Sequence, residues 1–445
     1  MSKKYTIRCK EINTNMNGIF TFNNSKFEAP GILPGEKAEI SLLYGKDKGR
    51  AVVENIIEPS PDRIAPVCPV YGTCGGCKLL HTTYENQLKI KTDIARKLLS
   101  GFGEVGECVG VSGEPFHYRN KIHATLGTDK KGNVISGLYE ETTHRVVKIT
   151  SCAIENVHAS KVMATIRDFM NRNHIKPYNE DTGKGTLRHV LFRTSATGDT
   201  LVVLVSGNKI FPEKNRLAKV ISEKHDFVKS IVVNYNTKKT SFVLGSKEEI
   251  ITGTGYVTDE MCGITFRISG KSFYQVNTPQ AERIYLDAIN KAGINNDDTV
   301  LDAYCGIGTI AAVAAKTSGA KEVVGVELSE AAVADARENV KLAGLKNIKF
   351  INEDAGDYLM AAIGADIHYS CIIMDPPRSG ASERFIKAVL KMSPEKLIYI
   401  SCNPVTLARD LKALTFRDYK AEYICPYDMF PQTGHIETVV VLKKK

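Results

Sequence analysis

No apolar run in this sequence of 445 residues approaches the length needed to cross a bilayer. The first residues, Met1 to Thr6, contain no apolar segment of the kind found in secretory signals. These two absences lead us to expect a cytoplasmic protein without a membrane partner. The sequence also contains no internal repeat and no low-complexity tract, which leaves ordinary globular domains.

The sequence has no large excess of one charge either. Its 59 Lys and Arg face 50 Asp and Glu, and the formal net charge of +9 permits nucleic-acid binding without establishing it. Eleven cysteines without a secretory signal argue against a disulfide framework and for metal-binding or catalytic roles. A chain of this length is expected to form two or three domains, each with its own core.

Three regions differ in their pattern. Residues 1–60 contain short β segments with Pro-Gly turns between them, which predicts a small β-barrel. Residues 61–270 predict an α+β central domain, in which short strands dominate after residue 117. Residues 271–445 alternate strands and helices, which specifies a doubly wound, mainly parallel Rossmann-like sheet. The predicted elements are strands at 5–9, 18–22, 37–43, 51–57, 200–206, 230–234, 299–302, 321–327, 348–354, 371–375, 396–400 and 437–443, and helices at 84–100, 158–172, 309–318, 330–343, 383–392 and 405–414.

A glycine motif follows the first strand of the last region. Gly306-Ile-Gly308-Thr-Ile-Ala fits a dinucleotide fingerprint, and Glu327, about twenty residues later, can accept hydrogen bonds from both hydroxyls of a ribose. Alone, these features do not distinguish NAD from S-adenosylmethionine. Asp302, just before the glycines, would oppose a pyrophosphate but can complement a cationic ligand, which favours the methyl donor.

Cys402 is the leading candidate for a catalytic residue. It follows the strand predicted at 396–400 and precedes a proline that opens a helical pattern. The carboxyl ends of parallel strands face the crevice where such sheets bind ligands, and a helix N-terminus favours a thiolate. The alternative is a small, buried packing residue.

Four other cysteines have the spacing of a metal site. Cys68-x5-Cys74-x2-Cys77, with Cys152 downstream, can hold either zinc or a [4Fe-4S] cluster, and the pattern alone favours neither. The remaining cysteines stand alone and are expected to be packing residues: Cys9, Cys108, Cys262, Cys305, Cys371 and Cys425.

Several motifs in order resemble the RNA uracil-5-methyltransferase family over essentially the whole chain. They are Ser272-Phe-Tyr-Gln275-Val-Asn277, Asp302-Ala-Tyr304-Cys-Gly306, Glu327, Asp375-Pro-Pro-Arg378, Ser401-Cys402-Asn403-Pro404 and His435-Ile-Glu437. The resemblance implies that Gln275, Tyr304, Glu327 and Asp375 line the S-adenosylmethionine site. Asp354 is a further candidate near the adenine.

The chemistry of C5 methylation explains two of these residues. Uracil C5 is a poor nucleophile, and addition of a thiolate to C6 places electron density at C5. Cys402 fits the thiolate, and Glu437 fits the base that removes the C5 proton. Asp375 is expected to contact the uracil or to position Cys402. A nucleobase amino-methyltransferase remains a rival, decided by whether Cys402 is essential, and a non-catalytic iron–sulfur RNA-binding protein is a second.

The resemblance also bears on the substrate. It implies a [4Fe-4S] cluster on the four cysteines, and residues 1–60 resemble the TRAM module, an OB-like RNA-binding fold. Together these features point to 23S ribosomal RNA, with one or two target uridines and no obligate protein partner. The segments 117–121 and 187–193 mix basic and aromatic side chains and are candidate RNA contacts, or else solvated strand edges.

Overall fold

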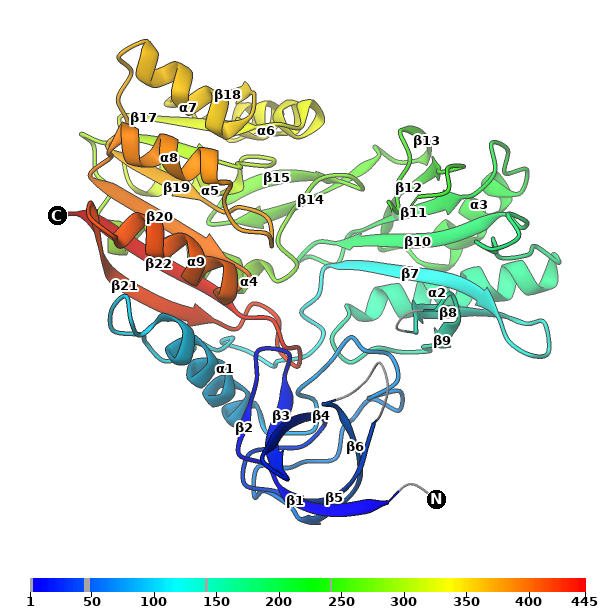
Figure 1. Ribbon diagram of the computed structural model, residues 1–445. Helices are drawn as coiled ribbons and strands as arrows, with labels where there is room; N and C mark the ends of the chain where they lie inside the picture. The colour runs from blue at the N-terminus through cyan, green and yellow to red at the C-terminus, as the bar shows by residue number, and fades with distance from the viewer. Residues whose placement is uncertain (1–2, 44–48, 141–142, 241) are drawn as a thin grey trace.

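The computed structural model describes residues 3–43, 49–140, 143–240 and 242–445, which form three lobes (Figure 1). The N-terminal lobe consists of two three-stranded sheets around one apolar core. The four strands predicted here are confirmed, and two more were not foreseen. The first sheet contains β1 (Lys4–Arg8), β5 (Lys37–Leu42) and β6 (Ala51–Glu58), and the second β2 (Glu11–Ile12), β3 (Asn17–Phe22) and β4 (Ser25–Pro30).

The central lobe is a seven-stranded mixed sheet with two helices on one face. The strand order is β13-β12-β11-β10-β7-β8-β9, and only β11 and β12 are parallel to each other among these pairs. The strands are β7 (Lys121–Thr128), β8 (Val134–Tyr139), β9 (Val146–Lys148), β10 (Leu187–Thr194), β11 (Thr200–Ser206), β12 (Val228–Tyr235) and β13 (Lys247–Thr252). The helices are α2 (Val157–Arg172) and α3 (Lys214–Lys224). The prediction of a single helix between residues 117 and 270 is therefore wrong: α3 is short and buries only three of its residues, which left a weak pattern.

The C-terminal lobe has the predicted Rossmann-like sheet, with strand order β18-β17-β16-β19-β20-β22-β21. The first five strands in this order, β18, β17, β16, β19 and β20, are parallel to one another. Strand β22 runs antiparallel to both of its neighbours, β20 and β21. From β16 the chain adds strands on one side of the sheet, through β17 to β18, and then returns to add β19 and β20 on the other side. The point between β16 and β19 is a topological switch point, where open α/β sheets bind ligands. The strands are β16 (Thr299–Ala303), β17 (Glu322–Glu327), β18 (Ile348–Asn352), β19 (Cys371–Met374), β20 (Lys396–Ser401), β21 (Tyr419–Tyr427) and β22 (Glu437–Lys444).

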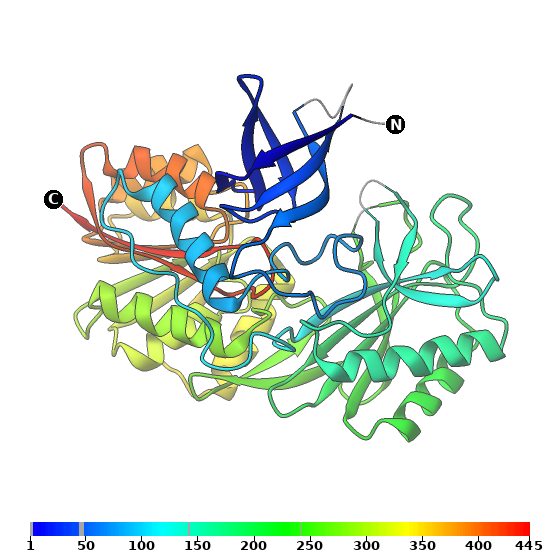
Figure 2. The ribbon, with the colours of Figure 1, turned by 90° about the horizontal axis from the view of Figure 1, so that it is seen from below.

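Helices cover both faces of this sheet. One face packs against α4 (Thr278–Ala292), α5 (Thr309–Thr317), α6 (Glu330–Leu342) and the hairpin of β14 (Tyr256–Met261) and β15 (Ile264–Ser269). The other face packs against α7 (Ala355–Gly364), α8 (Glu383–Met392), α9 (Pro404–Thr415) and α1 (Tyr84–Leu99). Helix α1 therefore joins the C-terminal lobe, and Figure 2 shows it beside both this lobe and the N-terminal sheets.

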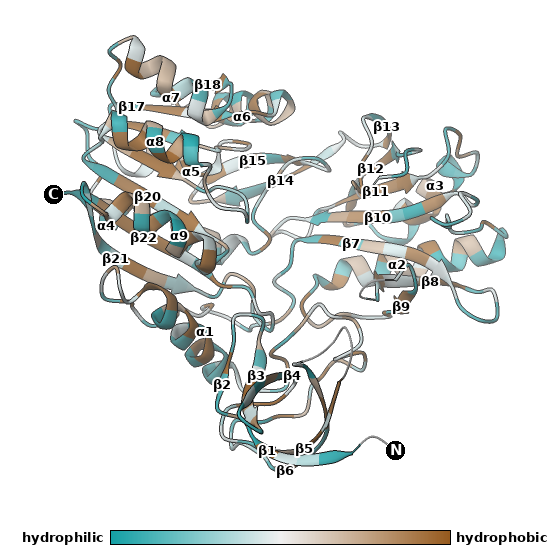
Figure 3. Cartoon of the chain, viewed as in Figure 1, coloured by the Kyte–Doolittle hydropathy of each residue, from teal (hydrophilic) through white to brown (hydrophobic). Residues whose placement is uncertain are grey.

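The apolar side chains follow this layering. In β11, Val202 and Leu204 face α2 and α3, whereas Leu201 and Val203 face the core shared with the C-terminal lobe. Figure 3 shows the hydrophobic colour concentrated on the strands of the two large sheets. Among the residues that the structure describes, no helix combines the length and the apolar character needed to cross a membrane.

Candidate active site

A cavity of about 610 Å³ opens at the carboxyl ends of the strands near the switch point. Seven of the residues predicted for the donor site and for catalysis line it, although they come from seven separate segments. The predicted residues in the wall are Gln275, Tyr304, Glu327, Asp354, Asp375, Cys402 and Glu437. The sheet thus gathers one polar side chain from the end of nearly every central strand, as parallel topology requires.

The turn after β16 lines this cavity with the residues 305–307. Gly306 and Gly308 have φ values of 56° and 80°, and a Cβ on Gly308 would lie 2.6 Å from the ring of Phe350. Tyr304 also has a positive φ, 68°, which a bulky L-residue rarely adopts. Backbone held in such a conformation is characteristic of functional sites.

Glu327 is fixed in orientation by the backbone around it. One carboxylate oxygen accepts a hydrogen bond from the N–H of Gly306 at 3.1 Å, and the other accepts from the N–H of Ser329 at 2.8 Å. The carboxylate therefore bridges the glycine turn and the start of α6, at the edge of the cavity. Asp354 caps α7 by accepting from the N–H groups of Gly356 and Asp357.

Asp302 does not face the ligand as expected. It is fully buried, does not line the cavity, and accepts a hydrogen bond from the N–H of Ala311 at 2.9 Å. Burial, with Asp375 nearby, holds its pKa well above the ordinary range. Asp302 thus stabilises the first turn of α5 through this hydrogen bond. The prediction that its charge faces a cationic ligand is wrong, because its side chain does not line the cavity.

Three titratable groups share the catalytic end of the cavity. Burial raises the pKa of Asp375 to about 7 and, together with Asp375, raises that of Glu437 well above its usual range. Burial and then these two carboxyls raise the pKa of the Cys402 thiol to about 11. The expectation that the helix end makes Cys402 a thiolate is therefore wrong for the free protein, because desolvation and neighbouring carboxyls outweigh it.

Arg378 is a functional candidate for which no role was predicted. It lines the cavity, hydrogen-bonds Cys402 and lowers the pKa of that thiol, opposing the carboxyls. Its guanidinium also lies 3.0 Å from the ring nitrogens of His435. The signal was present in the Asp-Pro-Pro-Arg motif, since the residue follows Asp375 after two prolines. Further aromatic residues in the wall are Phe273, Tyr285 and Phe430.

A second cavity, of about 960 Å³, shares Cys402 and Arg378 with the first. We call it the outer cavity. Its wall includes residues 14–17 of the N-terminal lobe, the segment 71–78 except Cys74, and residues 434–436. Cys402 is therefore reached from two sides, one beside the glycine turn and one between the lobes.

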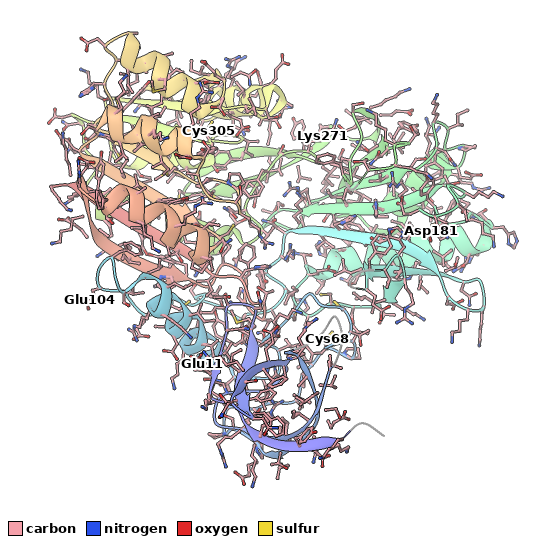
Figure 4. The ribbon with its side chains drawn as sticks, viewed as in Figure 1. Glu11, Cys68, Glu104, Asp181, Lys271 and Cys305 are labelled. Atoms are coloured by element: carbon pink, nitrogen blue, oxygen red, sulfur yellow. The ribbon has the colours of Figure 1, made fainter. Side chains whose placement is uncertain are left out.

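The four predicted metal-binding cysteines line a third cavity, of about 370 Å³, here called the cysteine cavity. Figure 4 places Cys68 between the N-terminal lobe and the two larger lobes, and Cys305 in the C-terminal lobe. The thiols are close enough to influence one another: burial and the other three cysteines raise the pKa of Cys77 to about 12. None of the eleven cysteines forms a disulfide. Of the six expected to be packing residues, five are buried and Cys262 is half-buried, and Cys305 also lines the first cavity.

The cysteine cavity is not a preformed site for one ion. Within the described ranges, no three His, Cys, Asp or Glu side chains are grouped so that they could hold a metal ion. A tetrahedral zinc needs its sulfurs about 3.8 Å apart, because each Zn–S bond is about 2.3 Å. The four thiols therefore line one cavity without the close grouping that a bound zinc ion requires.

One of the two predicted RNA-contact segments is wrong. Residues 187–193 lie in β10, in the middle of the central sheet, and Arg188, His189 and Arg193 are buried. Arg188 pairs with Glu180, and Arg193 donates to the carbonyl of Ser272. In the other segment, His117 is exposed and Arg119 lines the cysteine cavity, so its RNA contacts stay a prediction.

Comparison with protein families gives a match over residues 83–445 to the tRNA (uracil-5-)-methyltransferase family. An uncharacterized RNA methyltransferase of Halalkalibacterium halodurans is 38% identical over 423 residues, covering 94% of this chain and 92% of the relative. An uncharacterized RNA methyltransferase of Listeria monocytogenes is 38% identical over 419 residues, covering 93% and 91%.

The fold is also similar to a solved structure, the Pyrococcus abyssi tRNA (uracil-54, C5)-methyltransferase in complex with S-adenosyl-L-homocysteine. The TM-score is 0.77 at 24% identity, over 99% of this chain and 100% of the other. The similarity therefore extends over the N-terminal lobe as well as the two larger ones.

Proposed function

The chain belongs to the tRNA (uracil-5-)-methyltransferase family, and from that premise we propose that it methylates uracil C5 at one or two uridines of 23S ribosomal RNA. The observation that carries the reaction is the convergence of Cys402, Asp375 and Glu437 in one cavity beside the glycine turn. S-adenosylmethionine, when bound, supplies an electrophilic methyl group. Gln275, Tyr304, Glu327 and Asp375 would hold it.

Cys402 adds to C6 of the uracil and turns the ring into an enolate with electron density at C5. Since the pKa of the thiol is raised to about 11, its proton passes to the neighbouring Asp375 carboxylate, whose pKa is about 7, as the bond to C6 forms. A carboxyl whose pKa is raised towards neutrality or above is suited to exchanging protons at physiological pH. Glu437 removes the C5 proton after methylation, and elimination then releases the thiolate and restores the C5–C6 double bond.

The cysteine cavity supports a [4Fe-4S] cluster on Cys68, Cys74, Cys77 and Cys152. The four thiols line one cavity, and thiolates are the ligands that such clusters use. The role proposed for the cluster is structural. It would tie the loop before α1 to the segment before α2, and so fix the wall of the outer cavity.

Two features support ribosomal RNA as the substrate: the N-terminal lobe, which we propose to be a TRAM module at residues 1–60, and the cluster site in a central domain at 61–270. Transfer RNA is a second candidate. The Pyrococcus enzyme is named for transfer RNA, and its fold covers 99% of this chain, so a lobe of this kind also occurs with that substrate. The methyltransferase domain would occupy 271–445.

Mapping 5-methyluridine in ribosomal and transfer RNA from cells with and without the gene distinguishes the two substrates. We expect the modification to disappear from the large-subunit RNA and to persist in transfer RNA. Loss from transfer RNA alone would assign the second substrate, and a lost amino-methylated base would replace the proposed reaction.

A variant with Glu437→Gln tests the order of the steps. With the base removed, the C5 proton cannot leave and the thiolate cannot be eliminated. We expect a covalent protein–RNA adduct that already carries the methyl group, visible as a shifted band under denaturing conditions. The double variant that also carries Cys402→Ala should show no such band, and an unlabelled adduct would place Glu437 before methyl transfer.

A further inference from the structure

The loop of residues 428–436 connects β21 to β22, and it brings Phe430 to the first cavity and His435 to the outer one. Glu437 is the residue at which β22 begins, directly after this loop and opposite Tyr427 in the ladder. The loop has no helix or strand of its own. Its conformation therefore depends on groups outside it.

Four successive carbonyl groups of the loop accept hydrogen bonds from other segments. The carbonyl of Met429 accepts from the Asn277 side chain at 3.3 Å, and that of Phe430 from the Lys91 ammonium at 3.3 Å. The carbonyl of Pro431 accepts from the hydroxyl of Tyr118 at 3.1 Å. The carbonyl of Gln432 accepts from the backbone N–H groups of residues 78 and 79, at 3.1 and 3.0 Å.

Gln432 is held most completely. It is 3% exposed and has a φ of 70°, which is costly for a residue other than glycine. Its N–H donates to the side-chain oxygen of Gln87 at 3.0 Å, and its own side-chain oxygen accepts from the amide of Gln87 at 2.8 Å. Gln87 lies in α1 and is fully buried. One side chain of α1 thus satisfies both the backbone and the side chain of Gln432.

The two ends of the loop are anchored separately. At its start, Asp428 forms a fully buried ion pair with Lys91 of α1, at 2.6 Å. At its end, Ile436 packs in a small apolar cluster with Met16 of the N-terminal lobe and Leu79 of the loop before α1. Glu437 therefore follows a residue where three parts of the chain meet.

We propose that Gln87 is a positioning residue for the reaction, which through Gln432 fixes the loop and so holds Glu437 in place against the uracil. This inference rests on the proposed function. A buried amide pair in which each partner satisfies the other loses both hydrogen bonds when one partner is made apolar, and the unpaired groups then favour a rearranged backbone. Displacements of about 1 Å at a catalytic group can lower the rate on the order of 100-fold.

The test compares Gln87→Leu with Thr92→Val in the full-length enzyme. Thr92 is equally buried in α1, but its hydroxyl accepts from the N–H of Cys108 and donates to the carbonyl of Leu88, neither of which belongs to the loop. We expect Gln87→Leu to lower kcat about 10- to 100-fold, with RNA affinity unchanged. It should also accumulate the methylated covalent adduct, because Glu437 acts after methyl transfer. Thr92→Val should lower the melting temperature without accumulating adduct.

A second variant covers the case in which Gln87→Leu does not fold. Gln432→Gly suits the positive φ and keeps the backbone hydrogen bonds, but removes the side-chain oxygen. We expect Gln432→Gly to accumulate the methylated adduct above the level seen in the parent enzyme and in Thr92→Val. If both variants behave like Thr92→Val while Glu437→Gln still traps the adduct, the inference is wrong and the proposed function stands. If Glu437→Gln traps nothing, the proposed function itself fails.

Discussion

The catalytic cavity and the cysteine cavity differ in what holds their walls. Tyr304, Glu327, Asp375 and Cys402 each lie at or just past the end of a strand of one parallel sheet, and Glu437 begins its antiparallel neighbour. The four cysteines lie instead in two connecting segments, before α1 and before α2. The first cavity is shaped by the sheet before any ligand arrives. For the second, we propose that the final geometry comes from the cluster.

The largest effect is expected when the proposed nucleophile is removed from the catalytic cavity, whose wall the sheet holds. Cys402→Ala should reduce turnover on the order of 10⁴-fold or more, with both substrates still bound, because the sheet holds the rest of the wall. Single-turnover methylation and binding measurements check this. The matched control is Cys371→Ala, at a cysteine buried in β19, which should remain active. An active Cys402→Ala enzyme would overturn the assignment.

A ligand removed from the cysteine cavity should affect stability more than chemistry. Cys77→Ala is expected to lose the brown colour and the iron of protein prepared without oxygen, and to lose several kcal/mol of stability, because metal binding free energy there is also folding free energy. Iron and sulfide analysis with thermal unfolding tests this. Cys262→Ala, at a half-buried cysteine outside the cavity, should keep its iron. Stoichiometric zinc without sulfide would refute the cluster.

At the donor end of the rigid cavity, Glu327→Ala should weaken binding of S-adenosylmethionine by about 1–3 kcal/mol, or roughly 5- to 150-fold. The loss combines a ribose contact with the disturbance of the glycine turn, since Glu327 also accepts from Gly306. Isothermal titration of the variant with S-adenosylmethionine measures this loss of affinity. The affinity for RNA should barely change. Glu330→Ala, on the exposed start of α6, is the control. Tight NAD binding without donor binding would revive the dinucleotide hypothesis.

The smallest effect concerns pH and the buried carboxyl of Glu437. Its pKa is raised in the folded state, so its contribution to stability is fully present below the unfolded pKa and is lost as pH rises through the folded pKa. Glu437→Gln has no carboxyl to ionise, so the variant does not lose this stability as the pH rises. We expect its melting temperature to exceed that of the parent by about 2–4 °C at pH 8 and to equal it near pH 4. An equal difference at both pH values would contradict the raised pKa.

The sequence was informative where a strand end carries the function. The strands of the last region, except β21, were predicted within a few residues, and the side chains that follow the parallel ones converge as that topology requires. What it could not supply was sheet order. Arg188 and Arg193 resemble RNA contacts along the chain, but β10 became an interior strand and buried them. Most contacts of the 428–436 loop with α1 and the segments around it join residues more than 300 positions apart, as in Gln87 and Gln432, and no local pattern encodes them.

The positive φ of Tyr304 has a consequence for protein engineering. A glycine at this position would adopt the same backbone conformation without steric cost, so Tyr304→Gly relieves strain in the free protein. The same change removes an aromatic wall from the cavity and its edge-to-face contact with Phe385, at 5.2 Å between ring centres. A screen that selects only for thermal resistance would therefore be drawn towards inactive sequences at this position, and libraries should hold it constant.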